Sequence, residues 1–355
     1  MIVNARFLSQ PVTGVQRHAI EISKALMAIQ PDTTFVAPRK IVNHAVAEIL
    51  NPLIVGRRSG YYWEQIELPR FLRKHRRKEL LVSLANMAPV YYGPQIVTIH
   101  DTAPLRHPEW YSLRFSTVYR LLIPMIARRA DVILTDSLFA RDEIAQVTLV
   151  DKARIRVVHC AVPSGLTGDE TETVRDADGP YVLAVASFDP RKNLNRLVEA
   201  FLKLNRSDLR LVVVGADNSA VFNLSGLGAI LKSHENVVLA GSVDDHRLRR
   251  LYANAELFVY PSLYEGFGLP PLEAMAAGCP CLVSRAASLP EVCADAVEYC
   301  DPTDIDDIAG KMRTLLADKS KMNDLRTRGR MRAGEFSWEK SAEKIIEIAK
   351  GIAQR

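Results

Sequence analysis

Cysteine is scarce in this sequence. Five cysteines occur in 355 residues, at positions 160, 279, 281, 293 and 300. An odd count fits reduced thiols better than a disulfide framework. Cys279 and Cys281 are separated by a single residue, whereas ligand pairs in zinc sites are usually separated by two or more, so we expect no metal site.

Long apolar runs are also absent. No stretch approaches the roughly 18 uninterrupted apolar residues of a membrane-spanning helix. The opening residues, MIVNARFLSQPVTG, lack the basic head and long apolar core of a secretory signal. We therefore expect a cytoplasmic protein. Apolar residues make up 48% and charged residues 25% of a chain too long for one typical core, so we expect two globular domains.

Positive charge is concentrated in the first half of the chain. Residues 1–163 contain 22 Lys and Arg against 13 Asp and Glu, whereas the remainder contains 24 against 28. The densest basic stretch is RFLRKHRRKE, residues 70–79. Such a stretch could contact anionic lipid headgroups or nucleic acid, or could be the solvated face of a helix.

Short apolar runs alternate with helical patterns on both sides of a polar segment. Residues 164–180, SGLTGDETETVRDADGP, are predicted to be an interdomain linker. Before it we predict strands in QIVTIH, DVILTDS and IRVVHC, and after it in YVLAVAS, LRLVVVG, NVVLAG, AELFVYPS and CPCLVS. Continuous apolar strands between helices predict parallel sheets covered on both faces. Each half is therefore expected to be a doubly wound α/β domain, with ligands beyond the carboxyl ends of its strands.

The predicted domains are residues 1–163 and 181–337. The tail, 338–355, has Ser337 as a helix N-cap and apolar residues at helical spacing, which predicts an amphipathic helix. We expect this helix to pack back on the first domain.

Two adjacent cations follow the first strand of the second domain. Arg191 and Lys192 lie in SFDPRKNLNRLVEAF, just before a predicted helix. Cations oppose the helix dipole at this end, so a bound anion explains them better than a chance surface pair. Two cations on a loop after a parallel strand suit a diphosphate.

A second motif, EGFGLPPLEAMAAGCP at residues 265–280, combines acids with a helix start. Gly266 and Gly268 permit close backbone approach, and the two prolines suit a first helical turn. A helix N-terminus attracts phosphate, but Glu265 and Glu273 would repel it. Carboxylates accept hydrogen bonds from hydroxyl groups, so the two acids predict sugar contacts beside a phosphate. Together, the two motifs predict a nucleotide-sugar site.

These residues resemble a known family. PSLYEGFGLPPLEAMAAGCPCLVSRAASLPEV, residues 261–292, is similar to the signature of the retaining family 4 glycosyltransferases of the GT-B fold. TGVQRHAIEISKAL resembles the glycine loop and first helix of that family, TIHDTAPLRHPEWY its central His-Asp segment, and VASFDPRKNL its diphosphate loop. The resemblance implies two Rossmann-like domains facing across a cleft, the first binding the acceptor and the second the nucleotide sugar.

The resemblance also implies roles for single residues. Glu265 faces the donor sugar and Glu273 binds the ribose. His100 touches the transferred sugar, and Gly14 brings a second helix N-terminus to the departing phosphate. The implied catalytic set is His100, Asp101, Arg191, Lys192 and Glu265. The implied donor-binding set is Gly14, Ser187, Arg191, Lys192, Gly215, Val243, Glu265, Gly266, Phe267, Gly268, Leu269 and Glu273.

One departure from the family affects the phosphate site. Ala186 and Ser187 stand where much of the family has Gly-Arg, so Arg191 is expected to substitute for that arginine. The expected reaction is hexose transfer, with mannose from GDP-mannose as the best candidate, to a glycan or polyprenyl-linked acceptor. The enzyme is expected to need neither metal nor cofactor.

Two other functions remain open from the sequence. A nucleotide-sugar epimerase of the same architecture would use the same phosphate chemistry, although its acid and base residues are not evident. A non-catalytic, basic nucleic-acid-binding protein is less well supported, because no recognition motif or aromatic platform is found, and we expect no nucleic-acid partner. Peripheral contact with an anionic membrane is expected from the basic first half.

Overall fold

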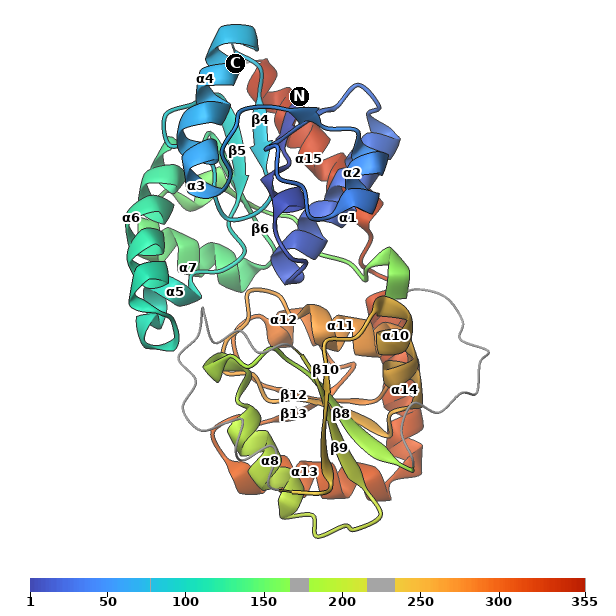
Figure 1. Ribbon diagram of the computed structural model, residues 1–355. Coiled ribbons are helices and arrows are strands. Elements are labelled where there is room, and N and C mark those ends of the chain that lie inside the picture. Colours follow the sequence, from blue (N-terminus) through green and yellow to red (C-terminus); the bar gives the residue numbers. More distant parts are fainter. Residues whose placement is uncertain (77, 167–178, 216–233, 355) are drawn as a thin grey trace. The chain divides into compact units, whose positions relative to one another are not determined.

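The computed structural model describes residues 1–76, 78–166, 179–215 and 234–354, which form two compact units (Figure 1). The first unit comprises Met1–Arg106, Thr117–Cys160 and Ser337–Arg355, and the second comprises His107–Ser116 and Ala161–Phe336. Most of the predicted linker lies outside the described residues; its start, Ser164–Leu166, is a 3-10 turn. These units differ from the predicted domains mainly because residues 107–116 lie with the second unit. Residues 161–163 also lie with the second unit, and Ser337 lies with the first.

The first unit is built on a parallel seven-stranded sheet with the order β3-β2-β1-β4-β5-β6-β7. Its strands are β1 (Ile2–Asn4), β2 (Thr34–Ala37), β3 (Leu53–Ile54), β4 (Leu81–Ser83), β5 (Gln95–Thr98), β6 (Val132–Thr135) and β7 (Ile155–Val157). The strand order reverses between β1 and β4, and in doubly wound folds the crevice beyond such a reversal binds ligands.

Helices cover both faces of this sheet (Figure 1). They are α1 (Gly14–Ile29), α2 (His44–Leu50), α3 (Gly60–Tyr62), α4 (Leu68–His75), α5 (Ala103–Arg106), α6 (Leu113–Arg129), α7 (Leu138–Thr148) and α15 (Trp338–Ala353). The amphipathic tail helix α15 packs against α1 and buries Ala342, Ile345 and Ile346. Burial of this apolar stripe explains why the end of the chain belongs to the first unit.

The second unit is built on a parallel six-stranded sheet with the order β10-β9-β8-β11-β12-β13. Its strands are β8 (Tyr181–Val185), β9 (Arg210–Val214), β10 (Val237–Gly241), β11 (Leu257–Tyr260), β12 (Cys281–Ser284) and β13 (Glu298–Cys300). Its described helices are α8 (Leu194–Leu202), α10 (Asp245–Asn254), α11 (Leu269–Ala276), α12 (Leu289–Cys293), α13 (Ile305–Ala317) and α14 (Lys319–Ala333). The strand order reverses between β8 and β11.

The central strands of each sheet are buried on both faces, as their continuous apolar runs predict. Val182, Leu211, Leu257 and Leu282 of the second sheet are fully buried among residues of α8 and α13. Covered parallel sheets leave their strand ends as the places where polar side chains can gather. Among the helices of the described residues, none has the length and apolar content needed to cross a bilayer.

Candidate active site

The two motifs of the second domain meet at the reversal of strand order in the second sheet. Arg191 and Lys192 lie in the 3-10 turn after β8, and Glu265 lies in the loop after β11. Asn193 ties these loops together, since its Nδ2 donates to Pro261 O at 3.0 Å and to Pro302 O at 2.6 Å. Asn193 adopts the left-handed conformation, with a φ of 60°. The structure thus brings together three predicted site residues from positions more than 70 residues apart.

Glu265 is the centre of a buried hydrogen-bond network. Its Oε1 atom accepts from Lys192 Nζ at 2.6 Å, Tyr260 OH at 2.8 Å and Ser262 Oγ at 2.6 Å. Its Oε2 atom lies 3.5 Å from Arg191 Nη1. Glu265 is 5% exposed. One oxygen is therefore saturated by protein donors, and further hydrogen bonding falls to Oε2.

The cations of this loop are balanced by acids. Asp189 accepts from Arg191 Nε at 2.6 Å and from its backbone N at 3.0 Å. Lys192 is paired with Glu265, so the four side chains carry no net formal charge. Asp189, Tyr260 and Ser262 were not predicted as site residues from the sequence. For Asp189 a signal was available, because it lies only two residues before Arg191.

The network keeps Glu265 ionised. Burial alone would raise the pKa of its carboxyl, but Lys192 and Arg191 outweigh burial and lower the pKa to about 2. Burial lowers the pKa of the Lys192 ammonium, and the attraction of Glu265 only partly offsets that effect. Removal of either partner would leave a buried, uncompensated charge, which is strongly destabilising.

The loop after Glu265 leads into helix α11. Gly268 is the N-cap of α11, with a φ of 110°, and a Cβ there would lie 2.6 Å from Leu289 Cδ2. Ser288 Oγ donates to Glu265 O at 2.9 Å and to Phe267 O at 2.8 Å, which fixes the loop. Since Pro270 and Pro271 carry no N–H, the donors at this helix start come from Gly268 and Leu269.

Glu273 lies within α11 and has a separate environment. It is 6% exposed, and its Oε2 accepts from the OH of Tyr252, a fully buried residue of α10, at 2.9 Å. Each acid thus accepts from a buried tyrosine, and Glu265 also pairs with two cations. Because their surroundings differ, Glu265 and Glu273 fit two different roles better than a shared role in supporting the glycine turn.

Three other predicted donor-binding residues follow strand ends of the same sheet. Ser187 follows β8, Gly215 follows β9 and Val243 follows β10. A Cβ at Gly215 would lie 1.9 Å from Ala186 O, so the close approach of two loops already requires glycine there. The backbone carbonyl of Ser187 accepts from Asp189 N at 2.8 Å.

In the first unit, α1 begins at Gly14. Thr13 and Gln16 form a capping box at this end. Gly14 is exposed, and an added Cβ would meet no protein atom within 4 Å. Packing of the chain therefore gives no reason for glycine at this position.

His100 follows β5, but its partner is not the adjacent acid. Its Nδ1 lies 2.7 Å from Asp136 Oδ2 and its Nε2 lies 3.2 Å from Leu84 O. Burial alone would lower the pKa of His100, but Asp136 and the hydrogen bonds raise it. Asp101 accepts from Ala103 N at 3.0 Å, at the start of α5. Both ring nitrogens of His100 thus have protein partners, and Asp136 was missed because it lies 36 residues away.

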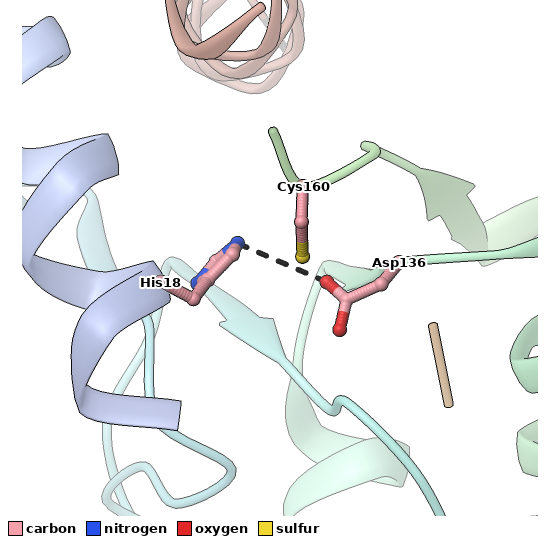
Figure 2. A group of neighbouring side chains, drawn as sticks. All are labelled: His18, Asp136 and Cys160. Atoms are coloured by element: carbon pink, nitrogen blue, oxygen red, sulfur yellow. Dashed lines mark ion pairs between the residues drawn. The ribbon is translucent and has the colours of Figure 1, made fainter. Parts of the chain in front are cut away.

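Asp136 also belongs to a buried polar cluster with His18 and Cys160 (Figure 2). Within the described part of the chain, His18, Asp136 and Cys160 are the one group of three metal-type donors within 4.8 Å of one another. His18 Nε2 lies 3.8 Å from Asp136 Oδ1. Burial raises the pKa of the Cys160 thiol well above its usual value and, together with His100, lowers the pKa of His18 to about 3. His18 and Cys160 are thus neutral at pH 7, and Asp136 lowers its energy in the cluster mainly through its short contact with His100.

The reversal of strand order in the first sheet holds a second buried group that was not predicted. Arg6 Nε lies 3.0 Å from Glu64 Oε2, and Asn4 Nδ2 donates to Glu64 Oε1 at 2.8 Å. Asn4 also donates to Ser83 Oγ at 3.2 Å. Glu64 is 1% exposed. The signal available in the sequence was weak, since Asn4 ends a three-residue strand and Glu64 lies in a helix.

Comparison with known proteins identifies the family of the chain. The family model described as Glycosyltransferase Family 4 matches residues 12–165, and the one described as Glycosyl transferases group 1 matches residues 169–332. The O-antigen chain mannosyltransferase B of Escherichia coli is 28% identical, with 97% of each chain covered. The O-antigen chain mannosyltransferase RfbU of Salmonella typhimurium is 27% identical, with 86% of this chain and 87% of the relative covered.

A solved structure shows the same fold. Sucrose-phosphate synthase from Thermosynechococcus elongatus aligns with a TM-score of 0.76 at 19% identity, covering 99% of this chain and 98% of its own. The family models match both halves of the chain, and each half has the doubly wound sheet of the GT-B fold. The chain therefore belongs to the family 4 glycosyltransferases of the GT-B fold.

Proposed function

We propose that the protein transfers mannose from GDP-mannose to a glycan or polyprenyl-linked acceptor in the synthesis of a surface polysaccharide, with retention of anomeric configuration. The names of the relatives support the sugar, because two that match most of the chain are O-antigen mannosyltransferases. The observation that carries the proposal is the meeting of Arg191, Lys192 and Glu265 at the strand-order reversal of the second sheet.

The donor diphosphate would be held by the loop after β8. Because Arg191 and Lys192 are balanced by acids, the diphosphate has to share these cations with Asp189 and Glu265. The start of α11 adds its positive dipole end and the N–H groups of Gly268 and Leu269. As the glycosidic bond breaks, negative charge grows on the diphosphate, and the cations stabilise it.

Glu265 suits a positioning role toward the donor sugar rather than a nucleophilic one. Its Oε1 is saturated by three donors, and the buried carboxylate is fixed by Lys192. Its Oε2 can accept a hydrogen bond from a hexose hydroxyl. In the proposed reaction the acceptor hydroxyl attacks the face that the diphosphate leaves, and the leaving phosphate takes the acceptor proton. Glu273 binds the ribose.

The first unit contributes Gly14 and His100 in this proposal. The absence of any protein atom near a Cβ at Gly14 leaves space for a ligand at the start of α1. Contact between a sugar and His100 Nε2 requires exchange of its hydrogen bond to Leu84 O. Asp101 supports the same segment by capping α5.

Peripheral contact with an anionic membrane is also proposed. Arg73, Lys78, Arg128 and Arg129 line two adjoining hollows of about 440 and 480 Å³ in the first unit. Tyr91, which is 68% exposed, borders both. Each basic residue near an anionic surface contributes about 1 kcal/mol, so four suffice for weak, reversible docking. Sedimentation with anionic and neutral vesicles at low salt tests this; equal binding to both would refute it.

The proposed activity is tested by melting curves followed by a transfer assay. A nucleotide sugar that binds the folded protein raises its melting temperature by mass action, so GDP-mannose should raise it more than UDP-glucose, UDP-galactose or dTDP-rhamnose. Transfer to methyl α-D-mannopyranoside should then yield an α-linked product and persist in EDTA. A β-linked product, or activity lost in EDTA and restored by magnesium, would contradict retention or metal independence, respectively.

A further inference from the structure

Residues 107–116 lie with the second unit although the chain on both sides belongs to the first. The first unit includes the chain up to Arg106 and again from Thr117. Within the second unit, the ring of His107 contacts the ring of Tyr264 edge-on, with centroids 5.8 Å apart. Tyr264 directly precedes Glu265. This segment of the first half therefore reaches the loop that carries the donor-site acid.

The segment presents stacked aromatic rings. His107 and Trp110 stack with centroids 4.0 Å apart and planes inclined by 14°. The stack follows from the 3-10 turn Pro108–Trp110, because side chains three residues apart lie above one another in such a turn. Trp110 is partly exposed, whereas Trp63 and Trp338 are 0% and 7% exposed.

A carboxylate borders the stack. Glu109, whose side chain is 62% exposed, lies with Oε1 3.1 Å from His107 Nδ1. An aromatic face carries negative charge, so it attracts the weakly positive C–H groups on one face of a pyranose ring. A carboxylate beside it accepts hydrogen bonds from the ring hydroxyls. An apolar ring face with one polar group at its edge is the usual composition of a small-ligand site.

We propose that His107 and Trp110 form a platform on which the terminal hexopyranose ring of the acceptor stacks, with Glu109 accepting hydrogen bonds from its hydroxyls. This inference rests on the proposed function, since it names the acceptor subsite of that reaction. Because His107 contacts Tyr264, the residue before Glu265, the platform lies close to the proposed reaction site. We therefore assign it to the acceptor. The donor sugar instead has Glu265 and the diphosphate loop as its partners.

Intrinsic fluorescence tests sugar binding directly, because Trp110 is the one partly exposed tryptophan. Methyl α-D-mannopyranoside and an α-linked mannobiose should change the emission of the parent protein saturably. Mannitol at equal concentration, which has no ring face, should not. Trp110→Phe should abolish the spectral response without abolishing binding, because a phenyl ring keeps a stacking face.

Kinetics with GDP-mannose and the mannobiose separate the subsites. Trp110→Ala should raise the acceptor KM about tenfold, in line with the worth of one aromatic contact, and Trp110→Phe about threefold or less. The donor KM should stay within about twofold of the parent value for both. Leu113→Ala, which truncates an 86% exposed side chain of the same segment, is the matched control and should change neither constant.

The outcomes are distinguishable. An unchanged acceptor KM in Trp110→Ala, or a donor KM raised as much as the acceptor KM, would overturn the platform. Absence of a saturable fluorescence response to either mannoside would do the same. If the parent transfers no sugar from any nucleotide donor, the proposed function fails, whereas the fluorescence titration still decides whether the platform binds a hexose.

Discussion

At the residue scale, the ion pair of Lys192 and Glu265 affects both the proposed reaction and the stability of the fold. A single substitution changes both at once. Lys192→Ala removes the cation that stabilises the leaving diphosphate, so kcat should fall by roughly a hundredfold or more. It also leaves Glu265 buried without its main partner, so the free energy of unfolding should fall by about 3 kcal/mol. The charge-neutral pair Lys192→Met with Glu265→Gln should recover most of that stability but not the activity.

Urea denaturation and steady-state kinetics on the three proteins check this prediction. Recovery of both stability and kcat in the double variant would show that the ion pair serves folding alone. Retention of the parental kcat in Lys192→Ala would remove the cation from the reaction altogether.

Glu273 should respond differently, because its proposed ribose contact is present in the ground state and in the transition state alike. Glu273→Ala should raise the donor KM by roughly tenfold and leave kcat within about threefold of the parent. Tyr252→Phe removes only the hydrogen bond to Glu273 Oε2 and is the control for a structural effect. If both variants lose stability and activity together while the donor KM stays parental, the ribose role is wrong.

His18 gives a pH signature of the buried cluster. Its folded-state pKa is lowered to about 3, so between pH 6.5 and 3 the unfolded chain binds a proton that the folded chain does not. Stability due to this group is therefore present above pH 6.5 and falls by about 1.4 kcal/mol per pH unit below it. His100 acts oppositely, because its raised pKa gives stability below pH 6.5 that is lost as pH rises through the folded pKa.

Urea midpoints of the parent and His18→Leu between pH 6.5 and 5, above the titration of Asp136, isolate the effect. As the pH is lowered, the free energy of unfolding of the parent should fall more steeply than that of the variant, by about 1.4 kcal/mol per pH unit. Equal slopes would mean that His18 titrates alike in the folded and unfolded chains.

At the element scale, the starts of helices α11 and α1 both have a glycine, but the packing of the chain requires glycine only at the start of α11. Gly268 has a φ of 110° and no room for a Cβ beside Leu289, so Gly268→Ala should lower the melting temperature and cost about 1–3 kcal/mol. Gly14 meets no protein atom, so Gly14→Ala should melt as the parent does while raising the donor KM. Melting curves paired with donor kinetics compare them. Parental donor kinetics in Gly14→Ala would argue against a ligand at the start of α1.

Elements with long apolar runs could be predicted from the sequence, and short ones could not. All eight predicted runs contain a strand, because each has at least two consecutive apolar residues. The strands β1 and β3, of three and two residues, have no comparable signal. The motif that contains Arg191 and Lys192 could be recognised because it is local, whereas the Asp136 partner of His100 depends on the neighbouring ends of β5 and β6.

At the scale of the whole molecule, each half of the chain builds its own parallel sheet and its own polar cluster at strand ends. Sequence position alone misassigns residues 107–116, which lie with the second unit. There the ring of His107 contacts that of Tyr264, more than 140 residues later in the chain. The sequence shows an apolar stripe on the tail helix, but only the structure shows that this stripe packs against α1. Long-range side-chain contacts of this kind have no local signature in a sequence.

The proposed function requires that a nucleotide diphosphate sugar binds where Lys192 meets Glu265. Calorimetric titration with GDP-mannose in EDTA measures that binding directly, for the parent and for the charge-neutral Lys192→Met with Glu265→Gln variant. We predict one site per chain in the parent and at least tenfold weaker binding in the variant, whose fold is checked by its melting curve. No binding to the parent, or an equal Kd for the two proteins, would contradict the proposed function.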